Sequence, residues 1–290
     1  MQELALTASL FLLMLGMGLS VRPKDFHRVF ARPALVLFSG VNILAIIPLI
    51  SFILIQIFQL PSELAVGLML VATMPGGMMS NLMTDLGRGD LALSLSMTLL
   101  ISVIYIILAP FGASLILSQF GGSALTETVP VQRFLTNLLT ITALPVCLGV
   151  VINVRYPQLA AAVRGWVKVV SSFGISLIFL IITVQQWSVL IASFYLIFLP
   201  VFILFSCAIG IAFLGTKILG AEKPQMTAVL MEHAVRQEGT ALYVALALFG
   251  STSAALPLAI SSPIGMLSAL LLLLIVRGTS RFTAATTAQS

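Results

Sequence analysis

The chain has 290 residues, of which 60% are hydrophobic and only 8% are charged, and its formal net charge is +5. So many apolar side chains cannot be packed inside one water-soluble globule, which must present a polar surface. The composition therefore excludes a soluble globular protein and indicates an integral membrane protein. The basic residues fall in short gaps between apolar runs, so no surface patch for nucleic acid is predicted.

Apolar runs of about twenty residues, the length that a helix needs to cross a bilayer, follow one another along the chain. The first run lacks the basic segment and the cleavage pattern of a secretory signal, so we expect it to be a spanning helix. Pro or Gly marks several of the short loops between the runs. The nine predicted spans are 2–20, 33–58, 63–85, 91–117, 134–153, 168–187, 189–215, 224–249 and 255–276.

Lysine and arginine are concentrated in alternate loops. Among the opposite loops only one holds a basic residue, Arg133, and one further arginine, Arg236, falls inside the eighth span. Because cytoplasmic loops are enriched in basic residues, we expect the N-terminus outside and the C-terminal tail, 278–290, in the cytoplasm of a bacterium, with the chain in its inner or cell membrane. The basic residues on the predicted cytoplasmic side are Arg22, Lys24, Arg28, Arg32, Arg88, Arg155, Arg164, Lys168, Lys217, Lys223, Arg277 and Arg281.

The third and eighth predicted spans differ from the other seven. In the third, the Pro-Gly-Gly segment 75–77 should interrupt the helix in mid-membrane, just before Ser80 and Asn81. In the eighth, the polar segment 232–238 lies one to two helical turns beyond the preceding loop. Interrupted helices are where secondary transporters place substrate and ion sites, because their ends present unpaired backbone groups. The two segments together predict a transporter site.

Several motifs together resemble those of the bile acid:sodium symporter family of secondary transporters. They are LGMGLS (15–20), PKDF (23–26), PGGMMSN (75–81) and RGDLALSLSMT (88–98), with a glutamate in the eighth span. The resemblance covers nearly the whole chain. It implies an all-α integral membrane protein built from inverted repeats, and this sequence is similar to the nine-helix form of the family.

The resemblance also implies a division of the single transporter unit, 1–290, into two parts. A core, about 33–117 and 189–276, would contain two discontinuous helices that cross, namely the third and eighth spans. A panel, about 2–20 and 134–187, would be the part against which the core moves.

One sodium site is implied by the residues that match the family's motif. Singly, hydroxyl groups on membrane helices more often bond to their own backbone, but five matching positions favour a site. Ser94 and Thr98 share a helix face, and neutral oxygens with one carboxylate suit a small hard cation. The implied Na⁺ ligands are Ser80, Asn81, Ser94, Thr98 and Glu232.

At the family's second sodium site this sequence departs from the pattern. The family's Glu-x-Gly-x-Gln-Asn-x-Gly is matched by 232–239, where the glutamine is replaced by Arg236, and the other side-chain ligand aligns with Ile43, next to Asn42. An arginine offers no oxygen to sodium and is permanently charged. We therefore expect its guanidinium to replace the second sodium ion, paired with Glu232 or with Glu238. The alternative is that it extends along the helix to the cytoplasmic interface.

These features predict a secondary active transporter of a small organic anion that is coupled to one Na⁺. No organic cofactor and no nucleic-acid partner are expected, the lipid bilayer is the other partner, and no oligomeric state is predicted. A nearby guanidinium and polar helix ends suit an anion. The candidate substrate-binding residues are Gln237, Thr240, Met78 and Asn42.

Other functions stay open at this point. Glu232 or Glu238 could carry a proton in place of sodium, and His233 adds a titratable group, although a packing role is favoured for it. A sodium-independent carrier or exchanger, a channel and a non-transporting membrane sensor would also use polar crossing segments. An enzyme is not expected, because no Ser/His/Asp or metal-ligand cluster with workable spacing is found.

Overall fold

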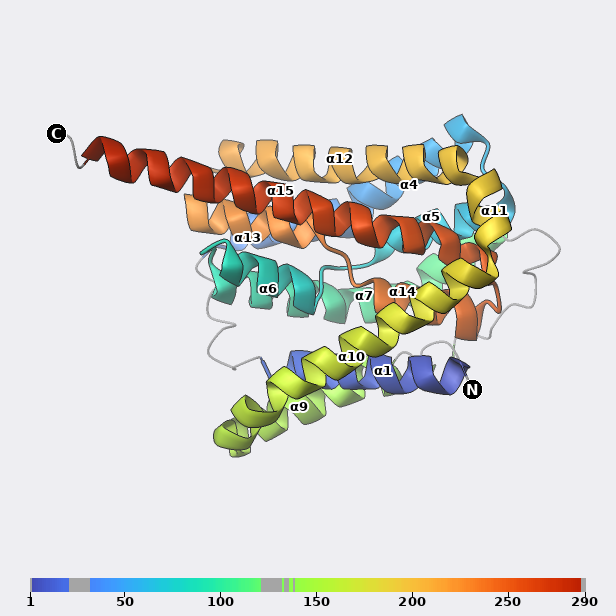
Figure 1. Cartoon of the computed structure of the whole chain (residues 1–290), viewed down its shortest axis with the longest axis horizontal. Coiled ribbons are helices and arrows are strands. Elements are labelled where there is room, and N and C mark those ends of the chain that lie inside the picture. Colours follow the sequence, from blue (N-terminus) through green and yellow to red (C-terminus); the bar gives the residue numbers. More distant parts are fainter. Residues whose placement is uncertain (1, 21–31, 121–131, 133–135, 138, 288–290) are drawn as a thin grey trace.

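The computed structural model describes residues 2–20, 32–120, 132, 136–137 and 139–287, and within these ranges every regular element is a helix (Figure 1). The predicted loop residues Arg22, Lys24, Arg28 and Arg133 and the PKDF motif lie outside the described residues. The first half contains α1 (Gln2–Gly18), α3 (Pro33–Val41), the π-helix η2 (Asn42–Ile46), α4 (Ile47–Phe58), α5 (Ser62–Thr73), α6 (Met78–Leu86) and α7 (Leu91–Phe120).

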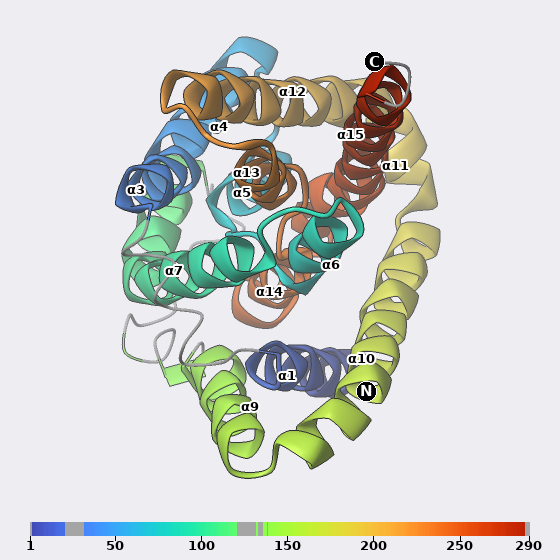
Figure 2. The ribbon, with the colours of Figure 1, turned by 90° about the vertical axis from the view of Figure 1, so that its left-hand side faces the viewer.

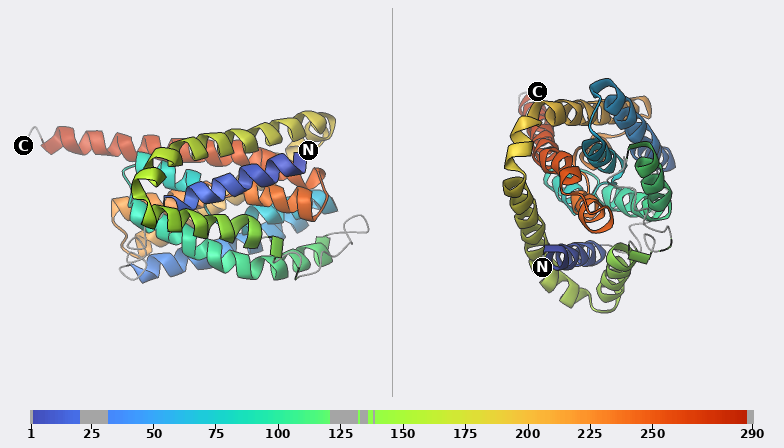
Figure 3. Two further views of the ribbon diagram at one scale, coloured as in Figure 1. Left: turned by 90° about the horizontal axis from the view of Figure 1, so that it is seen from below. Right: turned by 90° about the vertical axis from the view of Figure 1, so that its right-hand side faces the viewer.

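The second half begins with a π-helix and ends with a long helix that projects beyond the rest of the molecule (Figures 1 and 3). Its elements are η3 (Leu139–Ala143), α9 (Leu144–Arg155), α10 (Pro157–Gln185), α11 (Trp187–Ala192), α12 (Phe194–Ile218), α13 (Lys223–Ala234), α14 (Glu238–Tyr243), the π-helix η4 (Val244–Leu248), the 3-10 helix η5 (Ser253–Ala255) and α15 (Leu256–Thr287).

Five helical stretches of the described chain are long and apolar enough to cross a membrane. Large apolar side chains on these stretches point outward: Leu37 is 69% exposed, Phe173 68% and Leu214 60%. Such side chains are stable against lipid but not against water. The five stretches are Pro33–Phe58, Leu91–Ala109, Pro157–Gln185, Phe194–Ile218 and Ser253–Val276. Together they confirm an all-helical fold over the described residues, with five candidate membrane-spanning helices.

Two predicted boundaries differ from the structure. α10 begins at Pro157, about three turns before the predicted start of the sixth span, so Arg164 lies in a helix and not in a loop. Proline is favoured in the first turn of a helix, where its missing N–H costs nothing, and charged residues can extend a helix beyond the apolar region. At the other end of the chain α15 continues as a helix to Thr287, through most of the segment predicted as a tail, and this stretch contains no proline.

The helices pack in two groups. α1, α9 and α10 pack on one another at one side of the molecule, and the other long helices surround α5 and α13, which lie in the middle of the second group (Figure 2). α5 is buried without interruption from Leu64 to Ala72, and α13 from Thr227 to Ala234. A helix that is buried on all sides has no lipid-facing stripe. The ends of α5 and α13 therefore lie in the most protected part of the molecule.

α5 and α6 are separated by an extended segment. The helix ends at Thr73, because proline disfavours the helical conformation of the residue before it, and Met74 accordingly has ψ 138°. The chain stays extended through Gly77, at φ −141° and ψ −164°, and α6 then starts at Met78. Backbone groups freed in this way inside a membrane need new partners.

The break between α13 and α14 supplies those partners. α13 ends at Ala234, and Val235 is extended, with φ −120° and ψ 116°. Gly76 and Arg236 form an antiparallel bridge, and the Gln237 N–H donates to the Pro75 carbonyl at 2.9 Å. The two extended segments, about 160 residues apart in sequence, therefore lie side by side in the interior.

The loops that join α6 to α7, α9 to α10 and α12 to α13 lie at one end of the molecule, the left end in Figure 1. α1 starts at the opposite end, and α15 ends at the same end as these loops. Arg88, Arg155, Lys217 and Lys223 belong to or flank these loops. The basic residues that the sequence places in these loops thus share one end of the molecule.

Candidate functional site

A fully buried carboxylate, that of Glu232 near the end of α13, lies at the centre of a cluster of polar side chains. Ser80 from α6 donates its hydroxyl to Oε2 of Glu232 at 2.8 Å. Thr98 from α7 places its Oγ1 at 3.0 Å from Oε1 and 2.9 Å from Oε2. Three helices that are distant in sequence therefore converge on one acid.

Asn81 and Ser94 complete this cluster. The Ser94 hydroxyl donates to Oδ1 of Asn81 at 2.8 Å, and Oγ1 of Thr98 lies 3.4 Å from the same oxygen. The Asn81 amide N–H₂ in turn donates to the Gly77 carbonyl at 3.1 Å, in the extended segment. The structure thus brings together all five residues that the resemblance assigns to a sodium site. We call these five side chains the ion cluster.

The ion cluster contains more hydrogen-bond acceptors than protons. The Thr98 hydroxyl has one proton, yet its oxygen faces the Ser94 carbonyl at 3.0 Å, Oδ1 of Asn81 and both oxygens of Glu232. Ser80 likewise faces the Gly77 carbonyl at 2.6 Å as well as Glu232. One hydroxyl proton satisfies one acceptor well. Oxygens that converge without enough protons suit a small hard cation, which bonds to oxygen alone.

The chain shapes the ion cluster through backbone features as well as through its ligands. A Cβ atom at Gly76 would fall on the Glu232 carboxyl group, so only glycine lets the extended segment approach the acid. Asp90 caps α7 by accepting the Leu93 N–H at 3.0 Å, which fixes the start of the helix that carries Ser94 and Thr98.

Thr84 is a neighbour that the sequence interpretation missed. Its Oγ1 lies 3.2 Å from Oγ of Ser94 and also donates to the Ser80 carbonyl at 2.9 Å. It follows Ser80 by four residues on α6, and this spacing places both on one helix face. That spacing is the signal that could have identified it.

Arg236 is buried beside this cluster, with only 6% of its surface exposed. Its Nη1 donates to the Met74 carbonyl at 2.9 Å, across the two extended segments. Glu232 and Glu238 interact with it electrostatically, but within the described residues neither carboxylate is in ion-pair contact with it. Glu238 instead accepts a hydrogen bond from Ser261 of α15 at 2.9 Å. The guanidinium is thus held by a backbone carbonyl between two acids.

His233 is fully buried, and its ring takes part in a bond within its own helix. Nδ1 lies 2.8 Å from the Val229 carbonyl, so it is the protonated nitrogen, and Nε2 has no hydrogen-bond partner among the described residues. This geometry is that of a packing residue.

A cavity lies next to the two breaks, between α1, η3 and α9 on one side and α7 and α14 on the other. Its volume is about 90 Å³. Gln237 and Thr240 both line it, and Nε2 of Gln237 lies 2.6 Å from Oγ1 of Thr240. The residues around it are Met14, Met17, Pro75, Leu99, Ser102, Val103, Tyr105, Ile106, Thr142, Ala143, Val146, Cys147, Gln237 and Thr240. We call this the substrate cavity, after the two predicted substrate-binding residues that line it.

The other two candidate substrate-binding residues lie elsewhere. Met78, the first residue of α6, is 6% exposed, and Asn42, the first residue of η2, is fully buried with both amide atoms lacking a partner among the described residues. Neither is among the residues that line the substrate cavity. These two residues are therefore outside the lining of the substrate cavity, although Met78 directly follows Gly77, whose backbone lies against Gln237.

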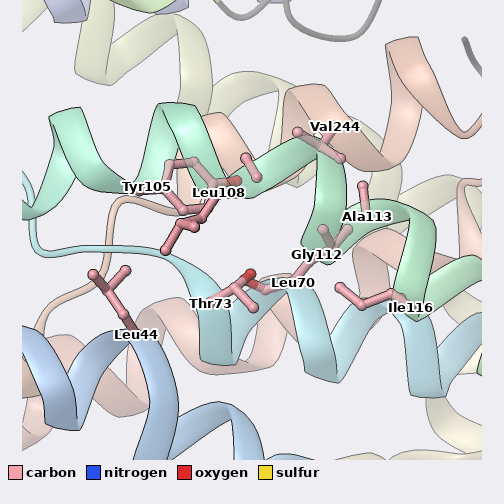
Figure 4. Close-up of a pocket in the computed structure, with 10 residues that line it drawn as sticks. Leu44, Leu70, Thr73, Tyr105, Leu108, Gly112, Ala113, Ile116 and Val244 are labelled. Carbon is pink, nitrogen blue, oxygen red and sulfur yellow. The ribbon is translucent and has the colours of Figure 1, made fainter. Parts of the chain in front are cut away.

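A second cavity, of about 90 Å³, lies between α7, α5, η2 and η4 (Figure 4). Tyr105 of α7 lines both cavities, so its side chain belongs to the wall between them. Small residues of α7 leave the space open. The lining residues are Leu44, Leu70, Thr73, Tyr105, Leu108, Ala109, Gly112, Ala113, Ile116 and Val244.

Comparison with known proteins identifies relatives that match between 53% and 86% of this chain. A protein of Bacillus subtilis (strain 168) named as an uncharacterized sodium-dependent transporter, YocS, is 31% identical over 252 residues, which cover 86% of this chain and 76% of that protein. The probable sodium/metabolite cotransporter BASS1, chloroplastic, of Arabidopsis thaliana is 27% identical over 86% of this chain and 61% of its own length. The mouse sodium/bile acid cotransporter 4 is 32% identical over 53% of this chain and 35% of its own length.

The match thus spans less than two thirds of the plant and mouse relatives. The model of the sodium bile acid symporter family matches residues 7–193, which is more than half of this chain. The chain therefore belongs to the sodium bile acid symporter family.

Proposed function

We propose that this protein is a secondary active transporter that couples the movement of a small organic anion to sodium through one Na⁺ site. The observation that carries this proposal is the convergence of the ion cluster on the Glu232 carboxylate, where oxygens outnumber protons. The names of the relatives, which describe sodium-dependent transport and cotransport, support the same coupling ion.

The architecture that we propose has nine spans and two moving parts. α5 with α6, and α13 with α14 and η4, are the two discontinuous spans, and they cross at the bridge between Gly76 and Arg236. α1, η3 with α9, and α10 form the panel, and the remaining helices form the core, in two inverted repeats. The N-terminus is outside and the basic loops face the cytoplasm, as the distribution of lysine and arginine favours.

Sodium binding and anion binding are coupled because they share structural elements. The ion cluster joins α6, α7 and α13, whereas the substrate cavity is lined by α7, α14 and Pro75. The Gln237 N–H that bonds to the Pro75 carbonyl fixes one element of the cavity relative to the other. A bound Na⁺ therefore stabilises the arrangement in which the cavity is formed, and by linkage a bound anion raises sodium affinity equally.

Arg236 takes the role of a second, permanently bound cation in this proposal. Its burial, its bond to Met74 and the electrostatic effect of Glu232 and Glu238 support a fixed charge in the interior. A buried arginine in a membrane needs acidic or carbonyl partners, and here it has both kinds of neighbour. One sodium ion then moves with each anion, so a singly charged anion moves without net charge.

Uptake into proteoliposomes tests the proposal. We expect labelled organic anions to accumulate when an inward sodium gradient is imposed, and not when an equal potassium gradient replaces it.

A second candidate, proton coupling, is favoured by the same surplus of acceptors, since one proton on Glu232 would also satisfy part of it. Accumulation driven by a pH gradient in the absence of sodium would support that candidate and contradict sodium coupling.

A further inference from the structure

The turn that joins α9 to α10 carries exposed basic and aromatic side chains. α9 ends at Arg155, Tyr156 is the single residue between the helices, and α10 starts at Pro157. The two helices meet at the side of the molecule opposite α12 (Figure 2). Four exposed residues at this turn, which we call the basic patch, are Arg155, Tyr156 at 63%, Arg164 and Trp166 at 75%.

The two arginines of the basic patch have no partner of opposite charge. Among the described residues, neither takes part in a salt bridge, a side-chain hydrogen bond or a cation–π contact. The sequence explains this, because it contains no aspartate or glutamate between Thr128 and Ala221. The one acidic residue of α1, Glu3, lies at the start of that helix, at the opposite end of the molecule. The helices α1, α9 and α10 therefore offer the patch no nearby acid.

Two other basic residues at the same end of the molecule do have partners within the protein. Arg32, which precedes α3, forms a salt bridge of 2.9 Å with Glu222, which precedes α13. Lys217, in the last turn of α12, lies 4.4 Å from the centre of the Phe213 ring. The position at this end of the molecule thus does not by itself leave a cation unpaired, and the basic patch differs from these two cations.

Arg164 lies within a helix that is long and apolar enough to cross the membrane. It follows the start of α10 by about two turns, and large side chains around it face outward: Leu159 is 53% exposed, and Trp166 is exposed as well. A charged side chain near lipid needs a partner, and arginine can extend along its helix towards the lipid headgroups. Tryptophan is enriched at the same depth of a membrane. These features place the guanidinium of Arg164 among lipid phosphates.

We infer that the basic patch binds the headgroup of an anionic phospholipid, with Arg155 and Arg164 on its phosphate. A guanidinium forms paired hydrogen bonds with phosphate, and the amphipathic rings of Tyr156 and Trp166 suit the headgroup level. A zwitterionic lipid offers the same phosphate but adds a cation, which two uncompensated arginines disfavour. The inference goes beyond the proposed function, because it concerns a lipid that holds α9 and α10 in the membrane and not the transported anion.

Quenching of tryptophan fluorescence by brominated lipids tests the inference on the full chain in bilayers. The chain has two tryptophans, Trp166 in the basic patch and Trp187 at the start of α11, beyond the other end of α10. Trp187→Phe leaves Trp166 as the reporter, and Trp166→Phe leaves Trp187. Each protein is reconstituted into phosphatidylcholine vesicles that contain either brominated phosphatidylglycerol or brominated phosphatidylcholine at the same mole fraction.

Trp166 should be quenched more strongly by the brominated phosphatidylglycerol. We expect a relative affinity of at least about five-fold in favour of the anionic lipid, which is the effect of about one basic residue at an anionic surface. Trp187 should show no such preference, because the sequence contains no basic residue between Lys168 and Lys217. The comparison of the two reporters separates a local site from a general attraction of the protein for anionic lipid.

Charge-removing variants of the Trp187→Phe chain locate the site. Arg155→Gln and Arg164→Gln should each lower the preference for phosphatidylglycerol, and the two together should bring it close to one. Lys217→Gln with Lys223→Gln is the matched control, because it removes the same charge from exposed positions at the same end of the molecule. The control should keep the preference. A single symmetric peak on gel filtration shows that each variant is folded before reconstitution.

Several outcomes would overturn the inference. Equal quenching of Trp166 by the two brominated lipids would mean that the basic patch does not select an anionic headgroup. A preference of the same size at Trp187 would reflect attraction to the whole protein and not a site. A preference that survives in the double arginine variant, or that is lost in the lysine control, would show that Arg155 and Arg164 do not hold the lipid. None of these results bears on sodium-coupled transport, which is tested separately by uptake.

Discussion

The ion cluster and the substrate cavity lie about one helical turn apart on α7, and their polar atoms are arranged in opposite ways. Around Glu232 each hydroxyl group faces two or more acceptors. In the cavity the hydroxyl of Ser102 and Oε1 of Gln237 face none among the described residues. The first region has too few protons for its acceptors, and the second has hydrogen-bonding atoms without partners.

This difference indicates what each region binds. A cluster of converging oxygens gains stability from a cation, which supplies charge without adding hydrogen-bonding requirements. A cavity with separate unpartnered donors and acceptors gains stability from a molecule that has hydrogen-bonding groups of its own. Because Thr98 and Ser102 are on successive turns of one helix, we expect the two ligands of the proposed function to influence each other's binding.

The largest effect is expected from Glu232→Gln, which keeps the side chain's size and removes its charge. Sodium affinity should fall by about 100-fold or more, because the loss of one partner from a buried charge interaction costs about 3 kcal/mol. Without sodium, the new amide N–H₂ can donate to the surplus acceptors, so the thermal midpoint should equal or exceed that of the unmodified protein. Thermal midpoints measured across a sodium titration check both expectations.

Glu63→Gln is the matched control for this change, because Glu63 lies in the first turn of α5, away from the ion cluster. It should leave the sodium titration unchanged. If sodium still raises the thermal midpoint of Glu232→Gln as much as that of the unmodified protein, sodium binds elsewhere. The ion cluster could then no longer be contrasted with the substrate cavity as a cation site.

The next effect is expected from Arg236→Gln, which restores the residue type of the family's second sodium site. The sodium dependence of uptake should become steeper, with a Hill coefficient that rises from about 1 towards 2, because a second ion replaces the fixed charge. Uptake of a singly charged anion should also become sensitive to membrane potential, by about 2.3 kcal/mol per 100 mV for one net charge.

Arg236→Lys keeps the charge and is the control, although lysine cannot reproduce the planar guanidinium. It should retain the shallow sodium dependence and the insensitivity to potential. If Arg236→Gln shows the same sodium dependence and the same response to potential as the unmodified protein, the guanidinium does not replace an ion.

The sequence was most informative where function depends on side chains in a continuous motif. Ser80 and Asn81 follow the Pro-Gly-Gly segment after two methionines, and Ser94 and Thr98 lie one turn apart, so the family motif sufficed to group them with Glu232. The helical class and the apolar spans followed from composition alone. The start of α10 did not, because a search for apolar runs stops at charged residues, whereas a helix that begins with Pro157 does not.

What the sequence could not predict depends on backbone atoms and on which side chains line the substrate cavity. The partner of Arg236 is the Met74 carbonyl, and a carbonyl group has no signature in a sequence. Met78 and Asn42 were grouped with Gln237 by proximity to motifs, but both are buried and neither lines the substrate cavity. Ser102 of α7 does line that cavity, and only coordinates reveal it.

The smallest effect is expected from Gly76→Ala, which tests whether the close approach of the two breaks determines the geometry of the ion cluster. The added Cβ would fall on the Glu232 carboxyl group, which must move away from Ser80 and Thr98. Overpacking of this kind costs about 1–3 kcal/mol, so sodium affinity should fall by roughly ten-fold to one hundred-fold while the anion cavity stays intact. Gly210→Ala is the matched control, because a Cβ at Gly210, inside α12, would meet no atom within 4 Å. That control should slightly stabilise the protein, since alanine favours a helix by about 1 kcal/mol over glycine. Equal sodium titrations of the two variants would mean that the Glu232 carboxylate can move without loss of the ion, so its contacts with Ser80 and Thr98 would not define the site.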